Sequence, residues 1–292
     1  MIAKIKMYGE FLRVNQYIKN LLIFAPIFFS FSFFEYDKVI NGFIAFVLFS
    51  IASSSIYILN DIYDISEDQL HPEKKNRPIA SRKIKKTSGF IISIFLMLIV
   101  LLFSFLFSLK VFYVIATYIM VNILYSVRLK HIPILDIFVI ALGFVLRVLV
   151  GGYATEIRTS MWLIVMSFLV ALFFAIAKRR DDIVLGESGL QTRKNISGYN
   201  LEFINAGLVM MGGVIIVSYI LYTISENIVT RFGTENIYIT SFFVIAGILR
   251  YMQITFVDGK SGNPTNIFFH DRFLQSMIFL WLLSFIIIVK LV

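Results

Sequence analysis

Three aspartates lie close together in the segment NDIYDISED at positions 60–68. On a helix, Asp61, Asp64 and Asp68 fall on one face, where their charges repel each other unless a cation lies between them. Mg²⁺ prefers hard oxygen ligands, typically one or two carboxylates together with substrate phosphate oxygens. The segment therefore predicts a catalytic Mg²⁺ site, to which Asn60 adds an amide oxygen or a hydrogen bond to phosphate. The alternative is a solvated acidic helix end.

Basic residues follow this segment and recur further along the chain. Arginine binds phosphate oxygens with a bidentate fork, and lysine supplies a point charge. A second polar stretch, at about 178–203, contains both acidic and basic residues, so we expect it to take part in substrate binding. The alternative is that its cations only anchor a membrane span. The candidate substrate-binding residues, besides Asn60, are Lys19, Asn20, Lys74, Arg77, Tyr125, Lys130, Asp136, Lys178, Arg179, Asp182, Arg193 and Tyr199.

Asp136 and Arg147 are 11 residues apart in one apolar stretch and share a helix face. An arginine is costly in hydrocarbon, so Arg147 must face the interior of a helix bundle or a wet cavity. It forms either a structural salt link to a neighbouring helix or a contact to substrate. Asp136 lies nearer the polar end of the stretch and is the better site candidate.

The composition indicates that these residues are carried by membrane helices. Of 292 residues, 59% are hydrophobic and only 15% charged, and mean hydropathy is +0.84. A membrane helix needs about 20 apolar residues. The sequence predicts an all-α, polytopic protein forming one membrane domain over 1–292. Its nine expected spans are 17–35, 38–59, 89–109, 111–127, 133–153, 160–177, 204–224, 236–254 and 273–291.

The distribution of charge predicts the orientation. With the N-terminus in the cytosol, most of the 27 lysines and arginines face the cytosol, as the positive-inside rule requires. The polar loops at about 60–88, 178–203 and 255–272 then lie on that side of the inner (cytoplasmic) membrane. The net charge of +9 is explained in this way, and no nucleic-acid-binding pattern is present. No signal peptide is apparent, and a chain without cysteine has no disulfides or thiolate metal sites.

The acidic motif, NDxxDxxxD, resembles that of the UbiA superfamily of intramembrane prenyltransferases. The chain is most similar to the decaprenyl-phosphate phosphoribosyltransferase branch of this superfamily. The resemblance covers most of the first 200 residues. It is carried by RVNQYIKNLLIFAP at 13–26, NDIYDISEDQLHPEKKNRPIAS at 60–81, YSVRLKHIPILDIFVIALGFVLRVLVGG at 125–152, AKRRDDIVLGE at 177–187 and RKNISGY at 193–199.

The resemblance implies nine helices around a central cavity that opens toward lipid. It implies Mg²⁺-dependent transfer of 5-phosphoribosyl from phosphoribosyl diphosphate (PRPP) to a polyprenyl phosphate that enters from the bilayer. Lys19, Lys130, Lys178 and Arg179 would contact phosphate groups. Where ordinary members carry a second motif with carboxylates four apart, this chain has adjacent Asp181 and Asp182 among basic residues. This departure weakens the case for two metal ions and suits a further anion, such as the ribose 5-phosphate.

Two other functions stay open from the sequence. One is a UbiA-type prenyltransferase that moves a prenyl group from a polyprenyl diphosphate to an aromatic or other small acceptor. The other is a transporter or lipid-binding scaffold that merely resembles the enzymes. The sequence also leaves open a homo-oligomer, the prenyl chain length and the glycan that the product serves.

Overall fold

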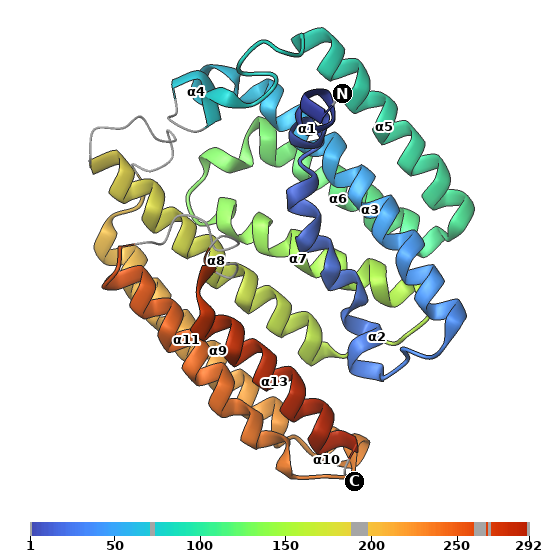
Figure 1. Ribbon diagram of the computed structural model, residues 1–292, viewed down its shortest axis with the longest axis vertical. Coiled ribbons are helices and arrows are strands. Elements are labelled where there is room, and N and C mark those ends of the chain that lie inside the picture. Colours follow the sequence, from blue (N-terminus) through green and yellow to red (C-terminus); the bar gives the residue numbers. More distant parts are fainter. Residues whose placement is uncertain (1, 71–73, 188–197, 260–266, 268–269, 291–292) are drawn as a thin grey trace. The chain divides into compact units, whose positions relative to one another are not determined.

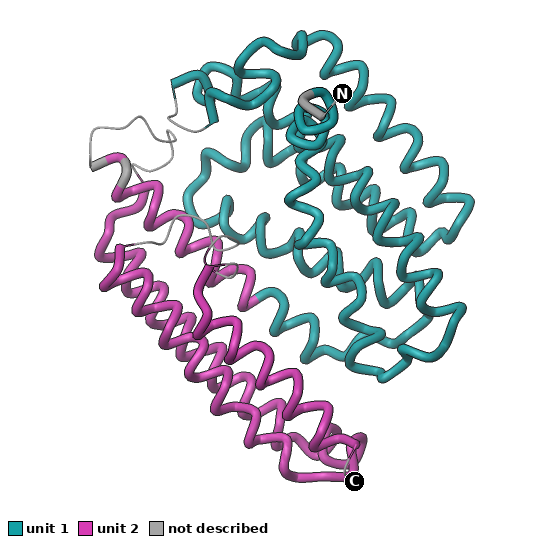
Figure 2. The backbone as a smooth tube through the Cα atoms, in the orientation of Figure 1, with its two compact units in different colours: residues 1–168, 189–195 teal, residues 169–188, 196–292 magenta. Residues whose placement is uncertain are grey.

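The computed structural model describes residues 2–70, 74–187, 198–259, 267 and 270–290, and these ranges contain helices and no strand. The chain divides into two compact units (Figure 2). Unit 1 comprises residues 1–168 with 189–195, and unit 2 comprises 169–188 with 196–292. The all-helical fold class is confirmed. A single membrane domain around a central cavity stays a prediction.

Unit 1 is built around the long helix α3, which packs against η1, α5, α6 and α7. Its core includes Phe49, Ile115, Tyr118 and Val150, contributed by α3, α6 and α7. The elements, seen in Figure 1, are α1 Ile2–Phe11, η1 Val14–Phe24, α2 Ala25–Ser30, α3 Tyr36–Tyr63, α4 Ile65–Leu70, η2 Lys74–Asn76, α5 Lys86–Phe107, α6 Leu109–Val127, η3 Leu129–His131 and α7 Leu135–Ala154.

Unit 2 begins within α8 (Met161–Glu187), which starts in unit 1. Helix α11 packs against both α9 and α13 (Figure 1). The Trp281 indole N–H donates to the Tyr219 hydroxyl at 2.6 Å, which ties α13 to α9. The remaining elements are α9 Leu201–Thr223, α10 Glu226–Phe232, η5 Asn236–Thr240, α11 Ser241–Phe256 and α13 Arg272–Lys290.

Eight helices of the described residues are long and apolar enough to cross a membrane, and they correspond to eight predicted spans. The first predicted span, 17–35, differs because it is divided between η1 and α2, with Pro26 in the first turn of α2. At about 2.0 Å per residue for a 3₁₀ helix and 1.5 Å for an α-helix, the two together measure roughly 31 Å. That length matches a bilayer core, but the count of nine spans is not confirmed.

The helix η1 is an unusually long 3₁₀ helix of 11 residues. Because a 3₁₀ helix has three residues per turn, side chains three apart line up along one face. Burial in η1 follows this period. The inner face carries Tyr17, Asn20 and Ile23, the exposed face Asn15, Ile18 and Leu21, and the half-buried face Gln16, Lys19 and Leu22.

The inner face of η1 is fixed by specific contacts to α3 and α7. The Tyr17 hydroxyl lies 2.7 Å from the Ser54 hydroxyl, and the Asn20 side-chain N–H donates to the Ser50 hydroxyl at 2.9 Å. Gly151 of α7 packs directly on the backbone of Ile23. A Cβ added to Gly151 would lie 2.8 Å from the Ile23 carbonyl carbon and closer still to its oxygen. Only glycine permits this approach.

Candidate active site

The three aspartates lie at the end of α3 and just beyond it, and all are buried. Asp61 is in the last turn of α3, Asp64 ends that helix, and Asp68 is in α4. Their exposed fractions are 2%, 6% and 3%. The backbone N–H of Asp68 donates to the Asp64 carbonyl at 2.8 Å, so the two helices join without an intervening loop. Buried carboxylates require paired cations or hydrogen bonds.

One arginine connects two of the carboxylates. The Arg77 Nη1 atom donates to Asp61 Oδ1 at 3.1 Å and to Asp68 Oδ2 at 2.6 Å. Arg13 forms a second ion pair with Asp61 Oδ1 and stacks on the Tyr57 ring at 5.1 Å. Arg13 was not among the predicted site residues. It has a left-handed backbone, φ 52°, at the junction of α1 and η1. The stretch RVNQ was the only sequence signal for it.

The third carboxylate has partners of its own. Asp64 Oδ1 forms an ion pair with the buried ammonium of Lys130, which lies in η3. The Asn60 side-chain N–H donates to Asp64 Oδ2 at 3.0 Å. The other amide atom, Asn60 Oδ1, is buried and has no hydrogen-bond partner in the described part of the chain. An acceptor left unsatisfied in this way is uncommon, and its own amide nitrogen bonds to one of the three carboxylates.

The cluster is electrostatically balanced by the protein itself. Burial raises the pKa of Asp68, the ion pair with Arg77 opposes that shift, and the charges of Asp61 and Asp64 add to it. Burial also lowers the pKa of Arg77, against the effect of its two carboxylate partners. The expected mutual repulsion is therefore relieved by arginine and lysine side chains.

The donor set suits Mg²⁺, because three carboxylates and the unsatisfied Asn60 oxygen are all hard ligands. Within the described residues, however, no three acidic or histidine side chains are arranged around a common metal position. Each aspartate is turned toward a cation instead. Mg²⁺ would have to replace these arginine and lysine side chains as the partner of the carboxylates. Metal binding by the three aspartates stays a prediction.

The other candidates of unit 1 lie on several elements. Asp136 is completely buried in the first turn of α7, where the helix dipole favours an acid. Lys74 forms part of η2, and Tyr125 is half-buried near the end of α6. Asn20 belongs to a second polar group around Arg147, with Lys19 beside it.

Arg147 is buried within α7, and among the described residues its partners are neutral. Its Nε donates to Asn20 Oδ1 at 2.8 Å, and its Nη1 donates to the Gly143 carbonyl at 2.7 Å. Its guanidinium also stacks on Phe49 and Tyr118, at 4.9 and 5.4 Å from the ring centres. Of the two alternatives for Arg147, the structural salt link is not found among the described residues.

Unit 2 holds the remaining candidates that the structure describes. Arg179 and Asp182, one turn apart in α8, pair with each other at 2.6 Å, and both are buried. Lys178 is exposed on the same helix. The buried Tyr199 stacks on Phe203, with ring centres 6.1 Å apart. Arg193 lies outside the described residues.

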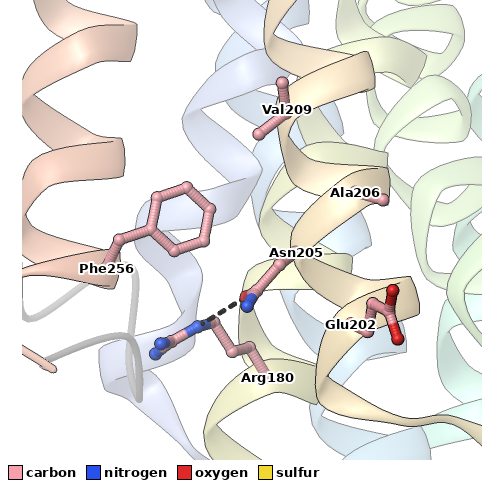
Figure 3. Close-up of a pocket in the computed structure, with 6 residues that line it drawn as sticks. All are labelled: Arg180, Glu202, Asn205, Ala206, Val209 and Phe256. Atoms are coloured by element: carbon pink, nitrogen blue, oxygen red, sulfur yellow. Dashed lines mark hydrogen bonds between the residues drawn. The ribbon is translucent and has the colours of Figure 1, made fainter.

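An open pocket in unit 2 contains a further arginine (Figure 3). Arg180 donates from Nε to Asn205 Oδ1 at 3.0 Å and stacks over Phe256 at 5.4 Å. Glu202, Ala206 and Val209 of α9 line the same pocket. Arg180 follows Lys178 and Arg179 in sequence, but the run of basic residues alone did not single it out.

The UbiA prenyltransferase family model matches residues 22–283. The chain belongs to this family. It is 31% identical to the decaprenyl-phosphate phosphoribosyltransferase of Mycolicibacterium smegmatis, over 92% of this chain and 88% of that protein. It is 30% identical to the enzyme of the same name from Corynebacterium glutamicum, over 95% of this chain and 85% of that protein.

Solved UbiA structures have the same fold. The UbiA homologue of Archaeoglobus fulgidus bound to DMAPP and Mg²⁺ matches with a TM-score of 0.68 at 18% identity, over 98% of this chain and 99% of that one. The same protein bound to GPP and Mg²⁺ matches with a TM-score of 0.69 at 19% identity, over 97% and 99%. The predicted resemblance to the UbiA family is confirmed, and the chain is a multi-pass membrane transferase of that family.

Proposed function

We propose that the protein transfers a 5-phosphoribosyl group from PRPP to a polyprenyl phosphate, releasing diphosphate in a Mg²⁺-dependent reaction. The observation that carries the proposal is the buried group of Asp61, Asp64 and Asp68 in direct contact with basic side chains. Relatives named decaprenyl-phosphate phosphoribosyltransferase, at 31% and 30% identity over most of both chains, support the choice of substrates.

The reaction places the greatest electrostatic demand on the leaving group. The bond between the anomeric carbon and the diphosphate breaks, and a bond from the same carbon to a lipid phosphate oxygen forms. Asp61, Asp64, Asp68 and Asn60 would hold Mg²⁺, which would neutralise charge on the departing diphosphate. A phosphate monoester is largely ionised at neutral pH, since its second pKa is about 6, so the nucleophile needs no strong base.

The basic side chains supply the rest of the charge stabilisation. In this structure Arg13, Arg77 and Lys130 form ion pairs with the carboxylates. Their side chains are long enough to rotate and contact phosphate oxygens instead. Arginine would grip two oxygens at once and lysine one. Lys74, Lys178 and Arg179 are further phosphate contacts in this proposal. The N-terminus and the polar loops lie on the cytosolic side of the inner membrane, and PRPP enters from the cytosol.

The test is a transfer assay with purified protein, ¹⁴C-labelled PRPP, decaprenyl phosphate and Mg²⁺. We expect labelled lipid and an equal amount of released diphosphate, and we expect EDTA to abolish both. Asp64→Asn should remove most activity, whereas Asp37→Asn, at the exposed opposite end of α3, should retain it. Labelled lipid formed at full rate in EDTA would contradict the metal assignment.

A second candidate is a prenyltransferase, favoured by the fold neighbour that binds GPP together with Mg²⁺. Incubation with geranyl diphosphate and an aromatic acceptor separates the two functions. Prenylation of the acceptor without any labelled lipid from PRPP would overturn the proposal. Movement of lipid phosphate across vesicles without covalent change would instead indicate the transporter.

A further inference from the structure

The inner face of α3 is polar well beyond its carboxylates. One turn before Asp61 stands Tyr57, and Ser54, Ser53 and Ser50 follow deeper in the same helix. All three serines are buried, and two of them bond to η1. A helix buried among apolar neighbours gains nothing from such a strip unless polar groups face it. The strip leads from the carboxylates to Arg147 and Lys19.

Among the residues that the structure describes, neither of these two cations forms an ion pair with a carboxylate. Lys19 lies in electrostatic range of Arg147, Arg13 and Tyr57. In the part of the chain that the structure describes, its ammonium has neither a hydrogen-bond acceptor nor an ion-pair partner. Arg13 is neutralised by Asp61, whereas the partners of Arg147 within the described ranges are an amide oxygen, a carbonyl oxygen and aromatic rings.

Burying the guanidinium of Arg147 and half-burying the side chain of Lys19 beside it is unfavourable unless an anion joins them. An ionised group inside a membrane protein costs several kcal/mol without a partner, and two like charges add to that cost. Arg147 is nevertheless held rigidly by Asn20 and by the rings around it. Tyr57 lies close enough to the same guanidinium to interact with it electrostatically. The hydrogen-bond donors of Lys19 and Arg147 are therefore already arranged around a position that suits an anion.

The depth of the group indicates which anion it takes. Tyr57 is one helical turn, about 6 Å, further into the bundle than Asp61, and Arg147 lies roughly 16 Å along α7 from Asp136. A water-soluble donor would meet the carboxylates first. A lipid headgroup would come from the hydrocarbon side, where Ile18 and Leu21 expose apolar side chains next to Lys19 on η1.

We propose that Lys19 and Arg147, with Asn20 and Tyr57, bind the phosphate monoester of a polyprenyl phosphate. The role of that lipid as acceptor rests on the function proposed above, but its binding at this group does not. The ammonium of Lys19 and the outer guanidinium edge of Arg147 contact the phosphate oxygens. Asn20 orients Arg147 and so acts as a positioning residue.

The test compares two ligands that differ only in the phosphate group. Binding of decaprenyl phosphate and of decaprenol to the full chain in detergent is measured without PRPP or Mg²⁺. Wild-type protein should prefer the phosphate. Lys19→Met should weaken phosphate binding about tenfold or more, the effect of one charged hydrogen bond, and leave decaprenol binding unchanged. Lys86→Met, an exposed lysine at the start of α5, is the matched control.

Thermal unfolding separates this role from a structural one. Because an uncompensated cation is removed, Lys19→Met should unfold at the same temperature as wild type or higher. Arg147→Lys, which keeps the charge, should retain more phosphate preference than Arg147→Met. An unchanged preference for phosphate in Lys19→Met would overturn the proposal, and so would an equal loss of both ligands.

The phosphate of the donor is the competing source of the anion. If ribose 5-phosphate displaced decaprenyl phosphate in a Lys19-dependent manner, the group would belong to the donor, and the proposal would be wrong. A failure of the phosphoribosyl transfer assay is distinguishable, because it would leave the binding preference and its dependence on Lys19 intact.

Discussion

Replacing Gly151 by alanine tests the close packing that positions η1 against α7. The added Cβ would lie 2.8 Å from the Ile23 carbonyl carbon, about 1 Å inside an ordinary carbon contact. The backbone of η1 must therefore move away. Overpacking costs about 1–3 kcal/mol. A shift of that size also lengthens the 2.8 Å hydrogen bond between Asn20 and Arg147 beyond bonding distance.

The expected loss of stability in Gly151→Ala is the sum of three contributions. A hydrogen bond to a charged group contributes about 1.5–3 kcal/mol, and alanine returns about 1 kcal/mol of helix propensity. We expect Gly151→Ala to be less stable by about 3 kcal/mol, which lowers the unfolding temperature by roughly 6 °C or more in a chain of this size. Since the cations of the lipid-phosphate site move by about 1 Å, turnover should fall up to about 100-fold.

The assay is thermal unfolding in detergent, followed by the transfer assay at a temperature where the variant is folded. Gly213→Ala in α9 is the matched control, because its added Cβ would meet nothing within 4 Å. The control should be as stable as wild type or up to about 1 kcal/mol more stable. If the two variants unfold at the same temperature and turn over at the same rate, the packing argument is wrong.

Three further predictions concern charged side chains. Asp64→Asn should reduce turnover at least about tenfold more than Asp181→Asn, because Asp64 is buried against Lys130 and Asn60. Lys130→Met should lower the unfolding temperature in EDTA by removing the partner of that carboxylate, at a cost of about 3 kcal/mol, and millimolar Mg²⁺ should restore part of the loss. The hydrogen bond from Arg250 lowers the pKa of Asp271. The ionised Asp271 carboxylate therefore stabilises the fold by about 1 kcal/mol or less. This stabilisation is present above the pKa that Asp271 has in the unfolded chain, and it is lost as the pH falls through its pKa in the folded protein. Asp271→Asn should therefore be less stable than wild type at pH 7 and equally stable in acid.

Hydropathy predicted the helices where the apolar run was unbroken. The helices α3, α5 and α13 were identified from composition alone, because about 20 apolar residues are sufficient to define a span. The first span is not confirmed, because its residues form a 3₁₀ helix followed by a short α-helix. Lys19 and Pro26 interrupt its apolar run, and no local pattern predicted the 3₁₀ winding.

The candidate site was predicted by residue type and not by pairing. The sequence indicated the three aspartates, Arg77 and Lys130, but not that one guanidinium joins Asp61 to Asp68. Arg13 was missed because its contact depends on a left-handed backbone at the junction of two helices. Pairings of this kind depend on tertiary geometry, whereas the abundance of carboxylates and cations is visible in the sequence.

The three-residue repeat of η1 determines which deletions this segment can accept. Because its faces repeat every three residues, deleting three residues would shorten η1 by one turn, roughly 6 Å, and keep each face in place. Deleting a single residue would rotate all following side chains by a third of a turn and turn Asn20 away from Arg147. Length variants of this segment should therefore be tolerated in steps of three.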